Sequence, residues 1–290
     1  RLVIGPWSHA MFLTYVGQLD FGFRASGYLL DIREDLTQMQ LRWFNRWLKG
    51  DPTSFATDAP VRVFVQGANR WRDEAAWPPE RVRLTPWYLR AGAALCTQAP
   101  GAEEPSDSYV YDPEDPCPTC GGTLLMPPQY SPGPVDQAPI LGRRDVLIYT
   151  SAPLAADLEI CGPVTLKLFV STSAVDTDWM AKLCDVHPDG RTFNVCDGVV
   201  RASYQAHTQG ASCAPDTPIC RELDLWATAM VFRAGHCLRL IVTSSDFPRY
   251  DRNPNTGENS FTATGSAPAL QTVFHTRDLP SCINLPVVNG

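Results

Sequence analysis

The 290-residue sequence lacks long apolar stretches and clusters of basic side chains. No segment approaches the roughly 20 consecutive apolar residues with which a helix crosses a bilayer, so we expect no membrane partner. Lys and Arg number 24 against 31 Asp and Glu, and the net charge of −7 argues against nucleic acid as a partner. The sequence shows no secretory signal peptide, but this absence is uninformative because the sequence begins inside a strand; we expect a cytoplasmic protein from its cysteine usage.

The chain lacks the ligand spacing of a structural zinc site, although it contains 10 cysteines. Cys117 and Cys120 form a C-x-x-C pair, but no second such pair and no His pair completes a set of four ligands. Four other cysteines lie in apolar, strand-like runs, where a free thiol behaves as a small hydrophobe: Cys161, Cys184, Cys196 and Cys237. We therefore expect buried or loop thiols in a reducing compartment.

The histidines beyond the N-terminal segment lack metal-ligand partners at a useful spacing. They lie in turns, in a polar loop and at a strand end: His187, His236, His207 and His275. We expect ordinary hydrogen-bonded roles for them at the surface or at a sheet edge, and no bound metal.

The first 50 residues have α/β character. Residues 1–4 form a short apolar run that is typical of a strand. The segment Asp31–Glu34 has the pattern of a capping box, and apolar side chains then recur at helical spacing as far as Leu48. The segment Lys49–Pro52 is a stop signal. We expect one amphipathic helix whose aromatic face, including its tryptophans, packs in a core.

Residues after about position 80 have the pattern of short strands, following an earlier alternating strand at Val61–Val65. Alternation and turn signals give eight candidates: Asp145–Thr150, Pro163–Ser171, Trp179–Val186, Thr192–Tyr204, Leu223–Val231, Cys237–Thr243, Ala269–His275 and Ile283–Val288. Many short strands with long loops are typical of an antiparallel β-sandwich of jelly-roll type. We expect Pro127–Pro139 to be an ordered surface loop that buries Tyr130 and Val135.

His9 is the residue that most directly indicates chemistry. It follows the apolar run at residues 1–4 and the turn formed by Gly5 and Pro6. A strand that ends in such a turn and then presents a histidine is a common way for α/β enzymes to place a base. The alternative is a histidine that only caps its loop by hydrogen bonding.

Seven motifs occur along the chain in the order in which one known family carries them: Gly5–His9, Leu41–Gly50, Phe64–Trp71, Gly121–Leu125, Asp176–Trp179, Asp185–Gly190 and Ser244–Asn253. With these motifs the sequence resembles the cocaine esterase and Xaa-Pro dipeptidyl-peptidase (CocE/NonD) family of serine hydrolases. The resemblance covers nearly the whole chain.

The resemblance implies a mainly β fold with two parts. Members of the family carry an α/β-hydrolase domain, a helical cap inserted within it, and a C-terminal jelly roll. Residues 1–80 would be the C-terminal remnant of the α/β-hydrolase catalytic domain. Residues 81–290 would form the jelly-roll, galactose-binding-like β-sandwich.

The same resemblance implies that His9 is the histidine of a Ser-His-Asp triad. In α/β-hydrolases the serine and the aspartate precede the histidine in the chain, so both are expected upstream of Arg1. No Gly-x-Ser-x-Gly nucleophile motif occurs among the 290 residues. We expect the chain to be inactive by itself, because a general base without its nucleophile forms no acyl-enzyme.

Family resemblance also implies a small-molecule ester, amide or short peptide as substrate, and no cofactor, because acyl transfer by a triad needs none. Leu125 and Met126 would supply an apolar wall of the substrate pocket. Assembly as a homodimer stays open. The alternative function is a non-catalytic jelly-roll module that binds carbohydrate or docks another protein.

A consequence for the helix near the N-terminus follows from the same resemblance. The sheet against which this helix packs in the family is not encoded by these residues. We therefore expect Trp43, Phe44 and Trp47 to form an exposed apolar patch instead of a buried one.

Overall fold

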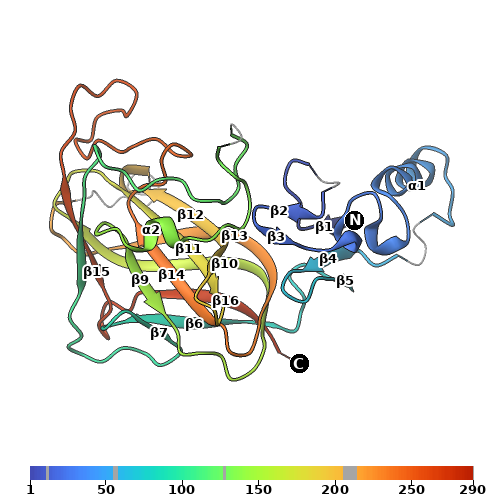
Figure 1. Ribbon diagram of the computed structural model, residues 1–290, viewed down its shortest axis with the longest axis horizontal. Coiled ribbons are helices and arrows are strands. Elements are labelled where there is room, and N and C mark those ends of the chain that lie inside the picture. Colours follow the sequence, from blue (N-terminus) through green and yellow to red (C-terminus); the bar gives the residue numbers. More distant parts are fainter. Residues whose placement is uncertain (11–12, 55–57, 127–128, 205–213, 290) are drawn as a thin grey trace.

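The computed structural model describes the chain except residues 11–12, 55–57, 127–128, 205–213 and 290; the side chain of Ile32 is also left aside. His207 and Cys213 therefore lie outside the described residues. Most of the chain forms one large β structure, and the N-terminal elements lie beside it (Figure 1). No helix in the described part of the chain combines the length and the apolarity needed to cross a bilayer.

The large sheet has 11 strands in the order β12-β11-β14-β9-β7-β6-β16-β10-β15-β8, with β13 paired to β10. A single parallel pair, Ala94 with Thr150, joins β7 to β9, and the other strand pairs run antiparallel. The strands are β6 (Val82–Arg90), β7 (Ala94–Cys96), β8 (Asp107–Tyr111), β9 (Leu147–Thr150), β10 (Leu158–Thr172), β11 (Asp178–Val186), β12 (Thr192–Arg201), β13 (Ile219–Phe232), β14 (Cys237–Thr243), β15 (Ala269–Phe274) and β16 (Cys282–Val288).

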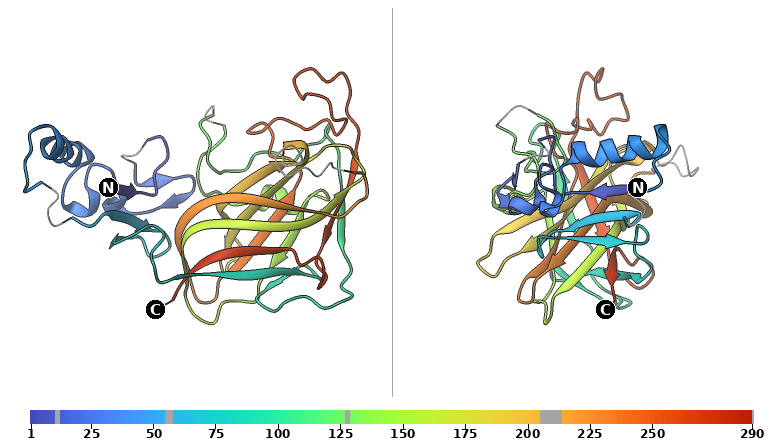
Figure 2. Two further views of the ribbon diagram at one scale, coloured as in Figure 1. Left: turned by 180° about the vertical axis from the view of Figure 1, so that it is seen from behind. Right: turned by 90° about the vertical axis from the view of Figure 1, so that its right-hand side faces the viewer.

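This sheet folds over on itself and encloses the main core (Figure 2). The folded sheet is the jelly-roll sandwich that the sequence predicts. Alternate residues of β11, such as Ala181 and Leu183, face the core, because successive side chains of a strand point to opposite faces. They meet alternate residues of β10 and β13, such as Leu166 and Leu223. All eight candidate strands of the sandwich are confirmed; Cys237–Thr243 has the predicted bounds, and the other seven have at least one shifted end.

Six strands lacked a sequence signal: β2 (Tyr15–Val16), β3 (Leu19–Asp20), β5 (Arg70–Glu74), β6, β7 and β8. Strand β6 contains Pro86 and is exposed along part of its length, so it shows no clean alternation of apolar and polar residues. Such strands are held by their neighbours more than by their own pattern. The short helix α2 (Ala138–Leu141) was also not predicted.

The N-terminal elements form a second, small sheet. Strand β1 (Leu2–Ile4) pairs in parallel with β4 (Val61–Val65), and β4 pairs with β5. A two-stranded hairpin, β2 (Tyr15–Val16) and β3 (Leu19–Asp20), and the helix α1 (Leu36–Leu48) complete this part.

The small sheet packs against the sandwich through β4 and β13. The backbone N–H of Gln66 donates to Ala229 O, and Val231 N–H donates to Gln66 O, both at 2.9 Å. Gly67 has a φ of +74°, and a Cβ there would lie 2.2 Å from Val231 O, so only glycine fits this close approach. The two parts of the chain are therefore joined by backbone contacts as well as by packed side chains.

Helix α1 begins later than its sequence signal. The capping box is formed by Asp35 and Gln38, with Asp35 Oδ1 accepting from Gln38 N at 2.6 Å. The expected box at Asp31–Glu34 is wrong, because Asp31 has a left-handed backbone (φ 65°) in a short 3₁₀ turn. Glu34 instead binds the guanidinium of Arg42. The C-terminal end, with Gly50 at φ 70°, is as predicted.

The aromatic face of α1 is exposed. Trp43, Phe44 and Trp47 are 40%, 53% and 65% exposed, and Met39 is the buried residue of the helix. The expectation that this face packs in a core is wrong within the chain, and the expectation of an exposed apolar patch is confirmed.

None of the nine described cysteines forms a disulfide, as expected for buried and loop thiols. Burial raises the pKa of Cys117 to about 12, so this thiol is a poor nucleophile and a poor ligand at neutral pH. Val135 is buried and Tyr130 partly buried, in agreement with an ordered loop at these positions.

Candidate functional site

His9 lies on the loop that follows β1. The parallel pairing of β1 with β4 aligns Leu2 with Val61 and Ile4 with Val63, which fixes the start of this loop. Trp7 anchors the loop, since its indole Nε1 donates to Ala25 O at 2.6 Å and its ring lies 5.7 Å from that of Trp71. The loop is thus held by a strand on one side and by a half-buried indole on the other, while His9 itself is exposed.

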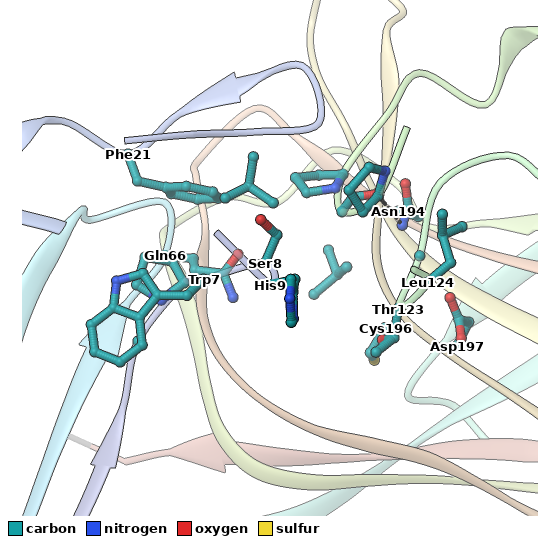
Figure 3. A pocket seen from close by; sticks show the side chains of 18 of the residues that line it. Trp7, Ser8, His9, Phe21, Gln66, Thr123, Leu124, Asn194, Cys196 and Asp197 are labelled. Carbon is teal, nitrogen blue, oxygen red and sulfur yellow. Dashed lines mark hydrogen bonds between the residues drawn. The ribbon is translucent and has the colours of Figure 1, made fainter. Parts of the chain in front are cut away.

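A cavity of about 340 Å³ opens beside His9. One wall comes from the N-terminal part, with Trp7, Ser8, Phe21 and Gln66. The opposite wall comes from the sandwich, and the imidazole of His9 lies between the two sets of side chains (Figure 3). The sandwich wall consists of Gly122, Thr123, Leu124, Pro132, Gly133, Pro134, Asn194, Val195, Cys196, Asp197 and Ala227.

The sandwich wall is a loop fastened onto β12. Gly122 and Gly133 exchange two backbone hydrogen bonds of 2.9 and 2.8 Å. Asn194 donates from Nδ2 to Gly133 O at 3.1 Å, and its Oδ1 accepts from Val135 N at 2.8 Å. Gly122 has a φ of +96°, and a Cβ there would lie 2.6 Å from Asp197 Oδ2. The loop therefore follows the strand closely and presents Thr123 and Leu124 to the cavity.

Asp197 connects the cavity wall to buried charges beneath it. Its Oδ1 accepts from Arg249 Nη1 at 2.8 Å, and Arg249 lies 3.6 Å from Asp246. Asp246 in turn binds Lys182 Nζ at 3.0 Å. Burial would lower the pKa of Lys182, but the charge of Asp246 outweighs it and raises that pKa, so the lysine stays charged. The charges alternate in sign, which is how such groups are tolerated in an interior.

The expected site residues have different positions relative to the cavity. His9 lines it. Leu125 is 75% exposed, and neither Leu125 nor Met126 is a lining residue, whereas the neighbouring Leu124 is. The assignment of Leu125 and Met126 to a substrate pocket stays a prediction.

Sequence reasoning missed Asn194 and Asp197, which supply polar groups to the wall facing His9. Both lie inside the strand-like run that became β12, where buried polar residues are uncommon. That departure from the apolar pattern was the available signal. The partner of Asp197, Arg249, is 52 residues away, and nothing local connects the two.

The remaining described histidines were expected to make ordinary hydrogen bonds at the surface or at a sheet edge, and the structure places each of them beside a carboxylate. His275 is fully buried at the end of β15, with Nε2 2.9 Å from Asp107 Oδ2. His187 and His236 lie next to each other, with ring centroids 4.5 Å apart, and both contact the buried Asp185. The long-range pairing of β11 with β14 brings this trio together.

Comparison with known proteins identifies relatives along the chain. A family described as the X-Pro dipeptidyl-peptidase C-terminal non-catalytic domain matches residues 53–283. Cocaine esterase of Rhodococcus sp. (strain MB1 Bresler) is 42% identical over 267 residues, which are 89% of this chain and 46% of the esterase. The chain spans about half the length of the curated relatives it matches.

Two solved structures share the fold across 99% of the chain. An aminopeptidase from a marine sediment archaeon, Thaumarchaeota archaeon, superimposes with a TM-score of 0.85 at 27% identity, and the match covers 49% of that protein. An α-amino acid ester hydrolase gives a TM-score of 0.81 at 28% identity over 50% of its length. The chain thus belongs to the cocaine esterase and Xaa-Pro dipeptidyl-peptidase family of serine hydrolases, and its residues 53–283 match the family's X-Pro dipeptidyl-peptidase C-terminal domain.

Proposed function

We propose that His9 is the general base of a serine hydrolase that cleaves esters, amides or short peptides. The position of His9 supports this proposal most directly. His9 lies on the loop that β1 holds, and it lines a cavity between the N-terminal part and the sandwich. His9 also lies outside residues 53–283, the segment that matches a domain described as non-catalytic. Relatives named as an esterase, an ester hydrolase and an aminopeptidase support this class of reaction.

In this reaction the imidazole takes the proton from a serine hydroxyl as its oxygen attacks the substrate carbonyl. The imidazolium then gives that proton to the leaving alcohol or amine, and an acyl-enzyme forms. Water then attacks the acyl carbonyl and loses a proton to the same ring, and the imidazolium returns that proton to the serine oxygen as the acid leaves. A carboxylate hydrogen-bonded to the second ring nitrogen would hold the required tautomer.

We propose further that the serine and the carboxylate lie upstream of Arg1 in a longer polypeptide. The order Ser, Asp, His in α/β-hydrolases supports this assignment, as does the length of the relatives, about twice that of the chain. Residues 1–80 then belong to the catalytic domain. Residues 81–290 form the sandwich, which closes the cavity with Thr123, Leu124 and Asp197.

The test is ester hydrolysis by the 290-residue chain and by its His9→Ala variant. We expect no release of p-nitrophenol from a p-nitrophenyl ester above the spontaneous rate in either protein, and no labelling by a fluorophosphonate, which reacts with activated serines. A burst of p-nitrophenol that disappears in the variant would contradict the proposal, because it would place the nucleophile within these residues.

A further inference from the structure

A second group of functional side chains lies at one end of the sandwich, and His9 is not part of it. Asp185 is buried at the end of β11, His187 follows it in the β11–β12 turn, and His236 lies in the β13–β14 turn. One ligand atom from each of the three lies within 4.8 Å of the others. We propose that Asp185, His187 and His236 bind a divalent transition-metal ion such as Zn²⁺.

Strand register explains why these three side chains meet. Strands β11 and β14 are antiparallel, with Asp185 opposite Leu238 and Val186 opposite Cys237. Continuing this register by one residue places His187 opposite His236. Residues two apart on a strand share a face, so Asp185 and His187 point the same way. All three side chains therefore lie on the same face of the sheet as Leu183, which points into the core, and they lie at one end of the sandwich.

The distances are close to those of a tetrahedral site. His236 Nδ1 lies 2.9 and 3.1 Å from the two carboxylate oxygens of Asp185, and His187 Nε2 lies 3.3 Å from Asp185 Oδ2. Zinc binds nitrogen and oxygen ligands at about 2.0–2.2 Å, which separates neighbouring ligands of a tetrahedron by roughly 3.3 Å. One cation would thus take all three ligands once the side chains move to bring the two imidazole nitrogens, which lie within 4.8 Å of each other, to that separation.

The set of donors selects the class of metal. Two imidazoles and one carboxylate suit zinc, copper or nickel, whereas Ca²⁺ and Mg²⁺ prefer all-oxygen sites. Three protein ligands leave a fourth position open. A cavity of about 170 Å³, lined by Asp185, His187 and Phe193 among others, leaves room for a water molecule there, and it shares the lining residues Phe21, Gln66 and Asn194 with the cavity beside His9.

The experiment is a calorimetric titration of the metal-stripped chain with ZnCl₂, beside the His187→Gln and His236→Asn variants. Each replacement amide can keep a polar contact with Asp185 from the position of the lost ring nitrogen, which is a hydrogen bond in the case of His236, but it is a poor zinc ligand. The variants should therefore unfold at the temperature of the parent when no metal is present, and any lost binding then reports a lost ligand.

We expect one equivalent of Zn²⁺ to bind the parent chain and to raise its Tm, because a ligand that binds the native state stabilises it. Either variant should bind at least about 100-fold more weakly, because even outer-shell partners of a metal contribute about 10- to 100-fold. A Cys117→Ser/Cys120→Ser variant should bind as the parent does. The proposal is wrong if the parent binds no Zn²⁺, or if both single histidine variants bind Zn²⁺ as tightly as the parent does.

Discussion

Glu104 shows how a single side chain fixes a loop between two strands of the sandwich. Its carboxylate accepts from Arg90 Nε at 2.8 Å and from the backbone N–H groups of Gly101 and Ala91 at 2.8 and 3.1 Å. The hydrogen bond from Arg90 is the main reason that its pKa falls from 4.5 to about 2. The carboxylate form is thus favoured by the folded state.

The Glu104→Gln variant should therefore lose stability at neutral pH, on the order of 1–2 kcal/mol with allowance for partial contact with solvent. A pKa that is lower in the folded state stabilises the fold above the unfolded pKa, and this stabilisation is lost as the pH falls towards about 2. Urea unfolding at pH 7 and pH 3 should show the gap between parent and variant shrinking at pH 3. A gap equal at both values would contradict this role.

Single residues differ in how far the sequence identifies them. His9 is visible because the strand, the turn and the histidine are consecutive in the chain. The trio of Asp185, His187 and His236 is not visible in the sequence. His236 lies about 50 residues after Asp185, and only the pairing of β11 with β14 brings them together. The same holds for Asp197 and Arg249.

At the scale of elements, Lys182 connects β11 to the loop that covers its outer face. Lys182 and Asp246 are both almost fully buried, and Lys182 Nζ also donates to Cys120 O at 3.2 Å. The Lys182→Met variant should lose about 3–5 kcal/mol of unfolding free energy, because Asp246 is then a buried charge without its lysine.

Adding Asp246→Asn to Lys182→Met should recover part of this loss, since no uncompensated carboxylate is then left. Urea denaturation of the two single variants and the double variant gives the coupling energy. Strictly additive losses would mean that the two side chains do not act as a pair.

The elements that the sequence predicted correctly are those that fill the main core. Strands β10, β11 and β14 each contribute every second side chain to the main core, because one face of each strand packs against the opposite sheet. The start of α1 was misplaced because Asp31 and Asp35 both precede an acidic or amide side chain by three residues. Only the backbone geometry of Asp31 decides between them.

At the scale of the molecule, the exposed aromatic face of α1 distinguishes the N-terminal part from the sandwich. Amides of α1 should exchange with solvent far faster than those of β10, β11 and β14, because α1 buries one residue whereas these strands surround the main core. Hydrogen exchange followed by mass spectrometry measures this contrast. Equal protection in both regions would show that α1 is packed in a way that the described contacts do not explain.

The two-part organisation itself was predicted from family resemblance more than from local pattern. The sheets do separate at β5 and β6, between residues 74 and 82. Composition and periodicity were sufficient to predict the sandwich. They did not predict the cavity, because its walls come from stretches far apart in the sequence that only the docking of β4 on β13 brings together.

The most direct test of the central proposal uses a longer polypeptide that includes the coding sequence upstream of Arg1. We expect it to hydrolyse a p-nitrophenyl ester and to react with a fluorophosphonate. Its His9→Ala variant should lose about 10⁴- to 10⁶-fold in kcat, as triad histidines do in serine hydrolases. Phe261→Ala, at an exposed position that does not line this cavity, serves as the matched control. An His9→Ala variant with the kcat of its parent would show that His9 carries no proton in the reaction.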